Sequence, residues 1–316
     1  MRTPRTPVST ANTAPAWGSV ARCGGEEGLA RSSVRPRGRR TSRIFLSDTR
    51  EIPQNRMSSR DGEAELLVAS SDATFARLGA DVIRGVWDDC PEGATILATG
   101  WTPIPVFREL AARHARGELS VPQCPIVQLD EYVGVEDSDP RSLYAWLDRE
   151  FLTPLEVDAS SVIRLRGTTA DSEQECSRFE AAVAAVGGLH RAVLGLGPNG
   201  HVGFNEPPSG PTARTRVVPL SPESMASNAR YWNGAEVPVE GITAGLDLLL
   251  AADVVVLLVA GAHKREILRR SVAGPESPEV PASYLRRVSR LIIVADDDAA
   301  AGLTPEEIGS RHQPRI

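Results

Sequence analysis

The sequence predicts an α/β protein with a Rossmann-like open, mostly parallel sheet and helices on both faces. From Glu65 onward, short apolar runs alternate with longer stretches in which apolar residues recur at helical spacing, the pattern of successive β-α units. Several of these runs lead directly into turns that carry glycine and ionisable residues. Such turns are expected at the carboxyl edge of a parallel sheet, where ligands bind.

The apolar runs predict strands, and the amphipathic stretches between them predict helices. The first strand is expected at 66–69, followed by a helix that Ser71 or Asp72 caps and whose apolar residues follow helical spacing up to Val86. The other strands are predicted at 94–98, 126–129, 192–196, 254–260 and 291–295, and the other helices at 104–115, 142–151, 172–186, 244–251 and 264–272. No repeat or boundary divides these units, so residues 57–316 are predicted to form a single domain.

Residues 1–56 differ in composition from the rest of the chain. They are rich in Arg, Pro and Ser, and they hold eleven Arg against four acidic residues, a balance of +7 that leaves −13 for the remainder of the total of −6. Without apolar periodicity this extension cannot bury a core, so we expect it to be disordered. Three interpretations stay open: residues upstream of a true start at Met57, a flexible basic arm, or an Arg-rich targeting peptide.

Composition also narrows the classes of partner. No apolar run approaches the roughly 20 residues of a membrane-spanning helix, so we expect a soluble, cytoplasmic protein with no membrane partner. The acidic body argues against nucleic acid as a partner. The four cysteines lack metal-ligand spacing, so we expect no metal. A monomer and a homo-oligomer both remain open.

The turn Thr99-Gly100-Trp101-Thr102-Pro103 follows one predicted strand and opens a helix, with Thr102 suited to the N-cap and Pro103 to the first helical position. Unpaired N–H groups at a helix start suit a phosphate. An ordinary strand-to-helix turn is the alternative interpretation.

Residues 195–200 match the dinucleotide pattern G-x-G-x-x-G, but their context contradicts a nucleotide site. The last glycine of that pattern must open a helix, and here Pro207, Pro208 and Pro211 follow it. We therefore reject a nicotinamide cofactor.

The same turn continues into His201 and Glu206, with Asn199 two residues before the histidine. A neutral imidazole near its unperturbed pKa of ~6.5 both takes and gives protons, and the neighbouring amide and carboxylate can orient it. Asp130 ends another predicted strand, where it is either a catalytic carboxylate or only a cap or ion-pair partner. The clustering of these groups favours catalysis.

Lys264 is the only lysine in a chain that otherwise uses arginine. It follows the predicted strand at 254–260, so its ammonium is expected at the carboxyl edge of the sheet, where it can meet a phosphate. Arg230 is a second candidate cation. A solvated helix face is the alternative explanation for either residue.

Together these segments resemble the glucosamine-6-phosphate deaminases. The resemblance rests on Thr99-Gly100-x-Thr102-Pro103, Leu129-Asp130-Glu131-Tyr132-Val133-Gly134, Gly200-His201-Val202-Gly203-Phe204-Asn205-Glu206-Pro207 and Gly261-x-x-Lys264, in that order. The related 6-phosphogluconolactonases share the fold and a Gly-His turn but generally lack the Phe-Asn-Glu-Pro continuation. The deaminase branch is therefore favoured.

The resemblance implies conversion of glucosamine 6-phosphate and water to fructose 6-phosphate and ammonia, without metal or organic cofactor. It implies that Asp130 moves the hydrogen between carbons 2 and 1, and that His201, tuned by Glu206 and Asn199, opens the sugar ring. The substrate-binding residues it implies are Gly100, Trp101, Thr102, Glu131, Arg230 and Lys264.

The chain departs from the family pattern at two of these positions. Asn199 stands where several members have an aspartate, and Trp101 where the family usually has a small residue beside the sugar phosphate. Trp101 keeps open the same chemistry on another amino-sugar phosphate, such as galactosamine 6-phosphate. A non-catalytic sugar-phosphate sensor is a further alternative, although residues 1–56 contain no helix-turn-helix.

Overall fold

The computed structural model describes residues 44–45, 64–90, 93–121, 124–304 and 307. Of the extension expected to be disordered, only Ile44 and Phe45 fall among these residues, and they form the two-residue strand β1 (Ile44–Phe45). The expectations for the rest of residues 1–56, and for a start at Met57, lie outside the described residues.

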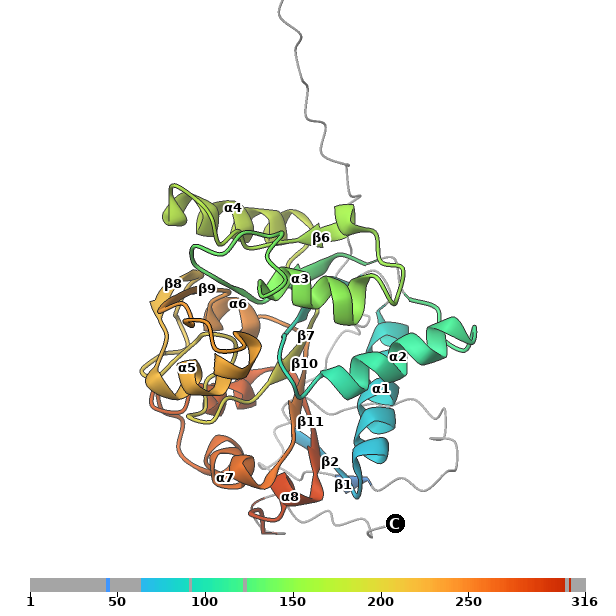
Figure 1. The fold of residues 1–316 in the computed structure, drawn as a ribbon. Helices are drawn as coiled ribbons and strands as arrows, with labels where there is room; N and C mark the ends of the chain where they lie inside the picture. Colours follow the sequence, from blue (N-terminus) through green and yellow to red (C-terminus); the bar gives the residue numbers. More distant parts are fainter. Residues whose placement is uncertain (1–43, 46–63, 91–92, 122–123, 305–306, 308–316) are drawn as a thin grey trace, which may run out of the picture.

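The main sheet is open and parallel, which confirms the predicted fold class (Figure 1). Its strand order is β1-β2-β11-β10-β7-β3-β4-β6, and every neighbouring pair is parallel. The predicted strands are present as β2 (Ala64–Ala69), β3 (Thr95–Leu97), β4 (Ile126–Gln128), β7 (Arg191–Gly195), β10 (Val254–Val259) and β11 (Arg290–Asp296). The short strands β1 and β6 (Val162–Ile163) extend the sheet beyond the prediction.

Helices cover both faces of this sheet. Along β10, Val255 and Leu257 pack into one core and Val256 and Leu258 into the other, because side chains alternate along a strand. The helices are α1 (Asp72–Asp89), α2 (Ile104–Ala115), α3 (Leu143–Leu147), α4 (Ser172–Ala185), α5 (Pro222–Asn228), α6 (Leu246–Leu250), α7 (Arg265–Ala273) and α8 (Asp297–Ala300). None of them is long and apolar enough to cross a bilayer within the part of the chain described.

The start of α2 differs from the prediction, although the helix itself occupies the predicted residues. Pro103 is the N-cap residue and its backbone is already helical, so the assignment of the N-cap to Thr102 is wrong. Ser71, by contrast, caps α1 as predicted, and its hydroxyl accepts the Thr74 N–H at 3.2 Å. The first N–H groups of α2 receive no side-chain cap.

A second, smaller sheet was not predicted. It is antiparallel and has the order β5-β9-β8, formed by β5 (Asp130–Tyr132), β9 (Glu240–Thr243) and β8 (Arg216–Pro219). Beside it lies a third apolar cluster that contains Tyr132, Phe204 and Trp232. The chain thus passes from β4 of the main sheet into β5 of the small sheet within two residues, and Asp130 lies at that crossing.

Candidate active site

Four loops that carry predicted site residues meet at one edge of the main sheet. They follow β3, β4, β7 and β10, which are parallel neighbours in the order β10-β7-β3-β4. Because the carboxyl ends of parallel strands share an edge, Gly100, Asp130, His201 and Lys264 are brought to the same side of the protein. This is the edge at which open α/β sheets bind ligands.

Asp130 is a buried carboxyl group with spare hydrogen-bonding capacity. It is 5 % exposed, pairs with Thr243 in the small sheet, and its Oδ1 has no hydrogen-bond partner among the described residues. Burial, and next the charge of Glu131, raise the pKa of Asp130 to about 8. A carboxyl group with a pKa near the working pH is suited to take up and return a proton.

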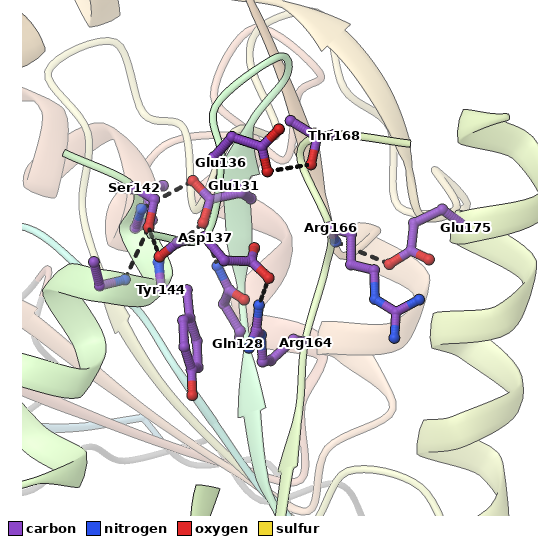
Figure 2. Close-up of polar contacts among 12 residues, drawn as sticks. Gln128, Glu131, Glu136, Asp137, Ser142, Tyr144, Arg164, Arg166, Thr168 and Glu175 are labelled. Atoms are coloured by element: carbon purple, nitrogen blue, oxygen red, sulfur yellow. Dashed lines mark hydrogen bonds and ion pairs between the residues drawn. The ribbon is translucent and has the colours of Figure 1, made fainter. Parts of the chain in front are cut away.

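Glu131 lies inside the protein, where its contacts suit a structural role, and its role in substrate binding stays a prediction. Its side chain is fully buried, and its two oxygens accept the backbone N–H groups of Tyr132, Leu143 and Tyr144 at 2.8–2.9 Å and the Gln128 amide at 3.0 Å (Figure 2). Burial raises its pKa despite these bonds. Adjacent residues of a strand point to opposite faces, so Glu131 faces inward and holds the start of α3.

We expect Glu131→Ala to lower the free energy of unfolding by about 2–5 kcal/mol, because it leaves two buried N–H groups and one half-buried N–H group without an acceptor. Urea denaturation measures the change. Glu136→Ala is the matched control, since Glu136 is exposed and accepts only the Thr168 hydroxyl at 3.2 Å. Its effect should stay within about 0.5 kcal/mol, and equal effects for both variants would contradict the inward role of Glu131.

The His201 imidazole is held by its Nδ1 atom. Nδ1 lies 2.7 Å from Asn199 Oδ1, 3.1 Å from Ser224 Oγ and 3.3 Å from Glu206 Oε2. The Asn199 amide nitrogen donates to Glu206, so its oxygen must accept, and the ring proton is assigned to Nδ1. This tautomer leaves Nε2 free to accept a proton. A Cβ on Gly197 would lie 2.2 Å from Nε2, so only glycine leaves room for the ring.

Glu206 supplies a permanent negative charge behind the imidazole. Burial alone would raise its pKa, but the bond and charge of His201 and the contacts of Ser224 and Asn199 outweigh burial and lower the pKa to about 2. Asn199 Nδ2 donates to Glu206 Oε2 at 2.8 Å and to Ser221 Oγ at 3.2 Å. A fixed carboxylate at this place stabilises the imidazolium that forms when His201 takes a proton.

Thr243 on β9 joins the Asp130 and His201 segments. It pairs with Asp130 across the small sheet, and its hydroxyl accepts the Phe204 N–H at 3.2 Å. Gly203, two residues after His201, packs so closely that a Cβ there would lie 2.9 Å from Thr243 Oγ1 and 3.0 Å from Leu129. Both predicted acid-base groups therefore lie on segments that pack against the same residue.

Two cations lie close together at this edge. Lys264 is 8 % exposed, and burial together with the charge of Arg230 lowers its pKa to about 8. Gly100 has a φ of +117°, which favours glycine, and its Cα faces the Tyr231 hydroxyl, 3.6 Å from a Cβ position. Thr102 lies half-buried in the same turn. Positive charge and an uncapped helix start suit a phosphate group.

Trp101 forms the outer part of this cation cluster. Its indole is 45 % exposed and stacks on Tyr231, with ring centroids 5.0 Å apart and an interplanar angle of 17°. The Arg230 guanidinium lies over the indole, 4.4 Å from its centroid. The departure at Trp101 thus gives Arg230 an aromatic platform.

Sequence reasoning missed two contributors to the site, Ser224 and Tyr231, and one buried partner of Glu131, Gln128. Ser224 contacts His201, Tyr231 stacks on Trp101, and Gln128 binds Glu131. Ser224 and Tyr231 come from a segment after β8 that has no strong periodicity, so no pattern marked them. The described part of the chain contains no group of three or more His, Cys, Asp or Glu residues arranged to hold a metal ion.

Comparison with known proteins gives consistent matches. A family model described as glucosamine-6-phosphate isomerases/6-phosphogluconolactonase matches residues 69–293. A glucosamine-6-phosphate deaminase of Corynebacterium aurimucosum is 36 % identical over 245 residues, which cover 77 % of this chain and 95 % of that protein. A protein of the same name from Streptomyces coelicolor is 37 % identical over 239 residues, covering 75 % and 87 %.

Solved structures resemble this fold as well. A structure described as a monomeric glucosamine-6-phosphate deaminase aligns with a TM-score of 0.72 and 31 % identity, covering 75 % of this chain and 99 % of that one. A 6-phosphogluconolactonase of Thermotoga maritima aligns with a TM-score of 0.60 at 18 % identity, covering 74 % and 100 %. The match to the 6-phosphogluconolactonase, at 18 % identity, supports only a shared fold.

Proposed function

This chain belongs to the family of glucosamine-6-phosphate isomerases and 6-phosphogluconolactonases, and from that premise we propose that it converts glucosamine 6-phosphate and water to fructose 6-phosphate and ammonia. It is an enzyme of the glucosamine-6-phosphate deaminase kind. The observation that most supports the proposed reaction is the buried Asp130 carboxyl group, whose Oδ1 lacks a hydrogen-bond partner within the described segments and whose pKa is raised to about 8. An aldose-to-ketose isomerisation needs one such base.

Ring opening is the first step, and His201 is placed to move its proton. With Nδ1–H bonded to Asn199, Nε2 accepts the proton of the hydroxyl on carbon 1 and returns one to the ring oxygen as the bond between carbon 1 and that oxygen breaks. Glu206 stabilises the imidazolium formed in between. The products of this step are the open-chain aldehyde and a neutral histidine.

Isomerisation and deamination follow on the open chain. Asp130 removes the hydrogen on carbon 2 as a proton, and the electron pair forms the double bond of an enolamine between carbons 1 and 2. The displaced electrons of the aldehyde move to its oxygen, which becomes a hydroxyl by taking up a proton released by the substrate's ammonium group. The same carboxyl group then returns the proton to carbon 1, which leaves a ketimine at carbon 2. Water adds to carbon 2, the carbon–nitrogen bond breaks, and ammonia leaves with fructose 6-phosphate as the other product.

The phosphate is assigned to the turn from Gly100 to Thr102 together with Arg230 and Lys264. Guanidinium and ammonium groups both bind phosphate, the first as a planar fork and the second as a point charge. The φ of Gly100 and the uncapped start of α2 orient backbone N–H groups in the same region. Binding energy at this end positions carbon 2 against Asp130.

The proposal is tested by measuring ammonia release from glucosamine, galactosamine and mannosamine 6-phosphates, with 6-phosphogluconolactone hydrolysis measured in parallel. We expect the highest kcat/KM with glucosamine 6-phosphate and no lactone hydrolysis. Faster turnover of a different hexosamine phosphate would change the assigned substrate but leave the proposed isomerisation and deamination unchanged. Lactone hydrolysis without ammonia release would contradict the proposed function.

Replacing Trp101 with alanine should raise KM roughly 3- to 10-fold, because Arg230 loses the aromatic surface that holds it near the phosphate turn. The value of kcat should change less than about twofold, since the platform is distant from the reacting carbons in the proposed pose. Steady-state kinetics separate the two constants. Trp101→Phe keeps an aromatic ring under Arg230, so its KM should lie between that of the native enzyme and that of Trp101→Ala. An unchanged KM in Trp101→Ala would contradict this role.

The pH profile of kcat/KM should be a narrow bell centred near pH 8. On the acid side the rate rises as Asp130 deprotonates, and on the alkaline side it falls as Lys264 loses the charge that binds phosphate. Initial rates at fixed ionic strength give the profile. Lys264→Arg keeps a positive charge above pH 8, so the fall in kcat/KM should move to higher pH. An unaltered alkaline limb in Lys264→Arg would show that Lys264 does not bind the substrate.

A further inference from the structure

A cavity of about 250 Å³ lies outside the site described above. Three arginines, Arg164, Arg166 and Arg178, line it together with Asp137 and the apolar side chains of β6. Its residues come from the loop after β5, from β6 and the segment that follows, and from α4. None of them belongs to the loops after β3, β7 and β10; Asp137 lies beyond β5, on the same chain segment that carries Asp130 of the proposed substrate site.

The charges of this cavity do not balance. Arg164 pairs with Asp137, and Arg178 donates to both oxygens of Glu175 at 2.6 and 2.7 Å (Figure 2 shows Arg164, Asp137 and Glu175). Arg166 is exposed, and only its backbone N–H binds Glu175, so its guanidinium has no partner among the described residues. The charges of Glu131 and Glu175 also act on Arg164, so Arg166 is the arginine of this cavity whose guanidinium lacks a bonded carboxylate among the described residues.

The close spacing of these arginines is also electrostatically unfavourable for Arg164. Burial, followed by the charge of Arg166, lowers the pKa of Arg164, and the charge of Arg178 acts in the same direction. The Arg164 Nε atom is buried without a hydrogen-bond partner among the described residues. Its guanidinium is fixed in place by the Tyr144 ring, 3.6 Å from the ring centroid. An anion in the cavity would relieve both the repulsion and the missing acceptor.

We propose that this cavity is a second anion-binding site that takes a small phosphate group, either the free ion or the phosphate of a small ester. Planar guanidinium forks match the geometry of phosphate oxygens, and the volume lies below the range of sites for drug-sized ligands. Arg166 supplies the unpaired charge, and Val162 and Ile163 give an apolar wall against which the carbon skeleton of an ester can lie.

The test measures binding of inorganic phosphate by calorimetry, with Lys264→Gln as background so that the proposed substrate site no longer contributes its ammonium. Adding Arg166→Gln to this background should weaken phosphate binding at least about 10-fold, the loss expected for a charge-assisted bond. Adding Arg84→Gln, which removes one exposed arginine of α1 paired to Asp88 at 3.9 Å, should leave the affinity unchanged. A parallel titration with glucose 6-phosphate shows whether the ester binds more tightly than the free ion.

The inference fails if Lys264→Gln binds neither probe, or if Arg166→Gln and Arg84→Gln alter the affinity equally. Because Arg166 is exposed, its replacement should not disturb folding, and equal melting temperatures of the two double variants verify this. A second readout in the native protein is the stoichiometry, which should be two phosphates per chain and fall to one in Arg166→Gln. These measurements require no turnover. The loss of one bound phosphate in Arg166→Gln tests this inference, whereas a native total below two with that loss intact would count against the phosphate site assigned to Lys264.

Discussion

Asp130→Asn is expected to lower kcat at least roughly 100-fold while the variant still binds glucosamine 6-phosphate. Asparagine keeps the size and polarity of the side chain but cannot take the proton from carbon 2. Ammonia release under saturating substrate measures kcat, and calorimetry measures binding. Full activity in Asp130→Asn would show that another group is the base.

The same substitution should stabilise the protein, and by an amount that depends on pH. Because folding raises the pKa of Asp130 from 3.8 to about 8, its stabilising contribution is complete below pH 3.8 and is lost as the pH rises through 8. Asparagine stays neutral throughout. The Tm of Asp130→Asn should therefore equal that of the native protein near pH 4 and exceed it at pH 9, and a lower Tm at every pH would contradict the burial of a free carboxyl group.

His201→Gln is expected to lower kcat/KM by roughly 100- to 10,000-fold, the range for loss of an acid-base group. Glutamine can still bond to Asn199, so the loss should come from the missing proton carrier and not from a collapsed turn. The residual kcat/KM should keep the same pH profile, with the acid limb assigned to Asp130 and the alkaline limb assigned to Lys264 at unchanged pH. Kinetics across pH and a melting curve of the variant measure both points.

His114→Gln is the matched control for this experiment. His114 bonds the Leu119 carbonyl and lies 3.6 Å from Glu156 at the far end of α2, outside the site. Its replacement should change kcat/KM less than about twofold. Comparable losses in the two variants would mean that a histidine-to-glutamine change acts on folding and that His201 has no special role.

The main sheet was predictable because its strands are continuous apolar runs buried on both faces, as β10 shows. The small sheet was not, because β5 reads Asp-Glu-Tyr and β8 ends in Pro219, so neither has the apolar alternation of a strand. Their pairing depends on contacts across the fold, such as Asp130 with Thr243. Such long-range pairing leaves no local signal.

The site residues show the same difference between features that a local pattern marks and features that only the tertiary fold decides. Glycine turns after apolar strands placed Gly100, Asp130, His201 and Lys264 at one edge, and the structure agrees on that edge. The direction of a side chain is a finer property: the structure turns Glu131 inward, one residue along the strand from Asp130, and no local pattern marks that direction. Arg178 joins the arginine cavity from another element, so only tertiary structure reveals that cluster.

The single lysine gives this enzyme an unusually selective target for covalent labelling. Lys264 is the only ε-amine among the 316 residues, and at pH 8 about half of it is unprotonated given its pKa of about 8. A small acylating reagent that reaches this side chain would modify one lysine besides the α-amino terminus, and peptide mass mapping would assign the adduct to Lys264. Protection by a bound sugar phosphate would then report occupancy of the pocket directly, without any turnover assay.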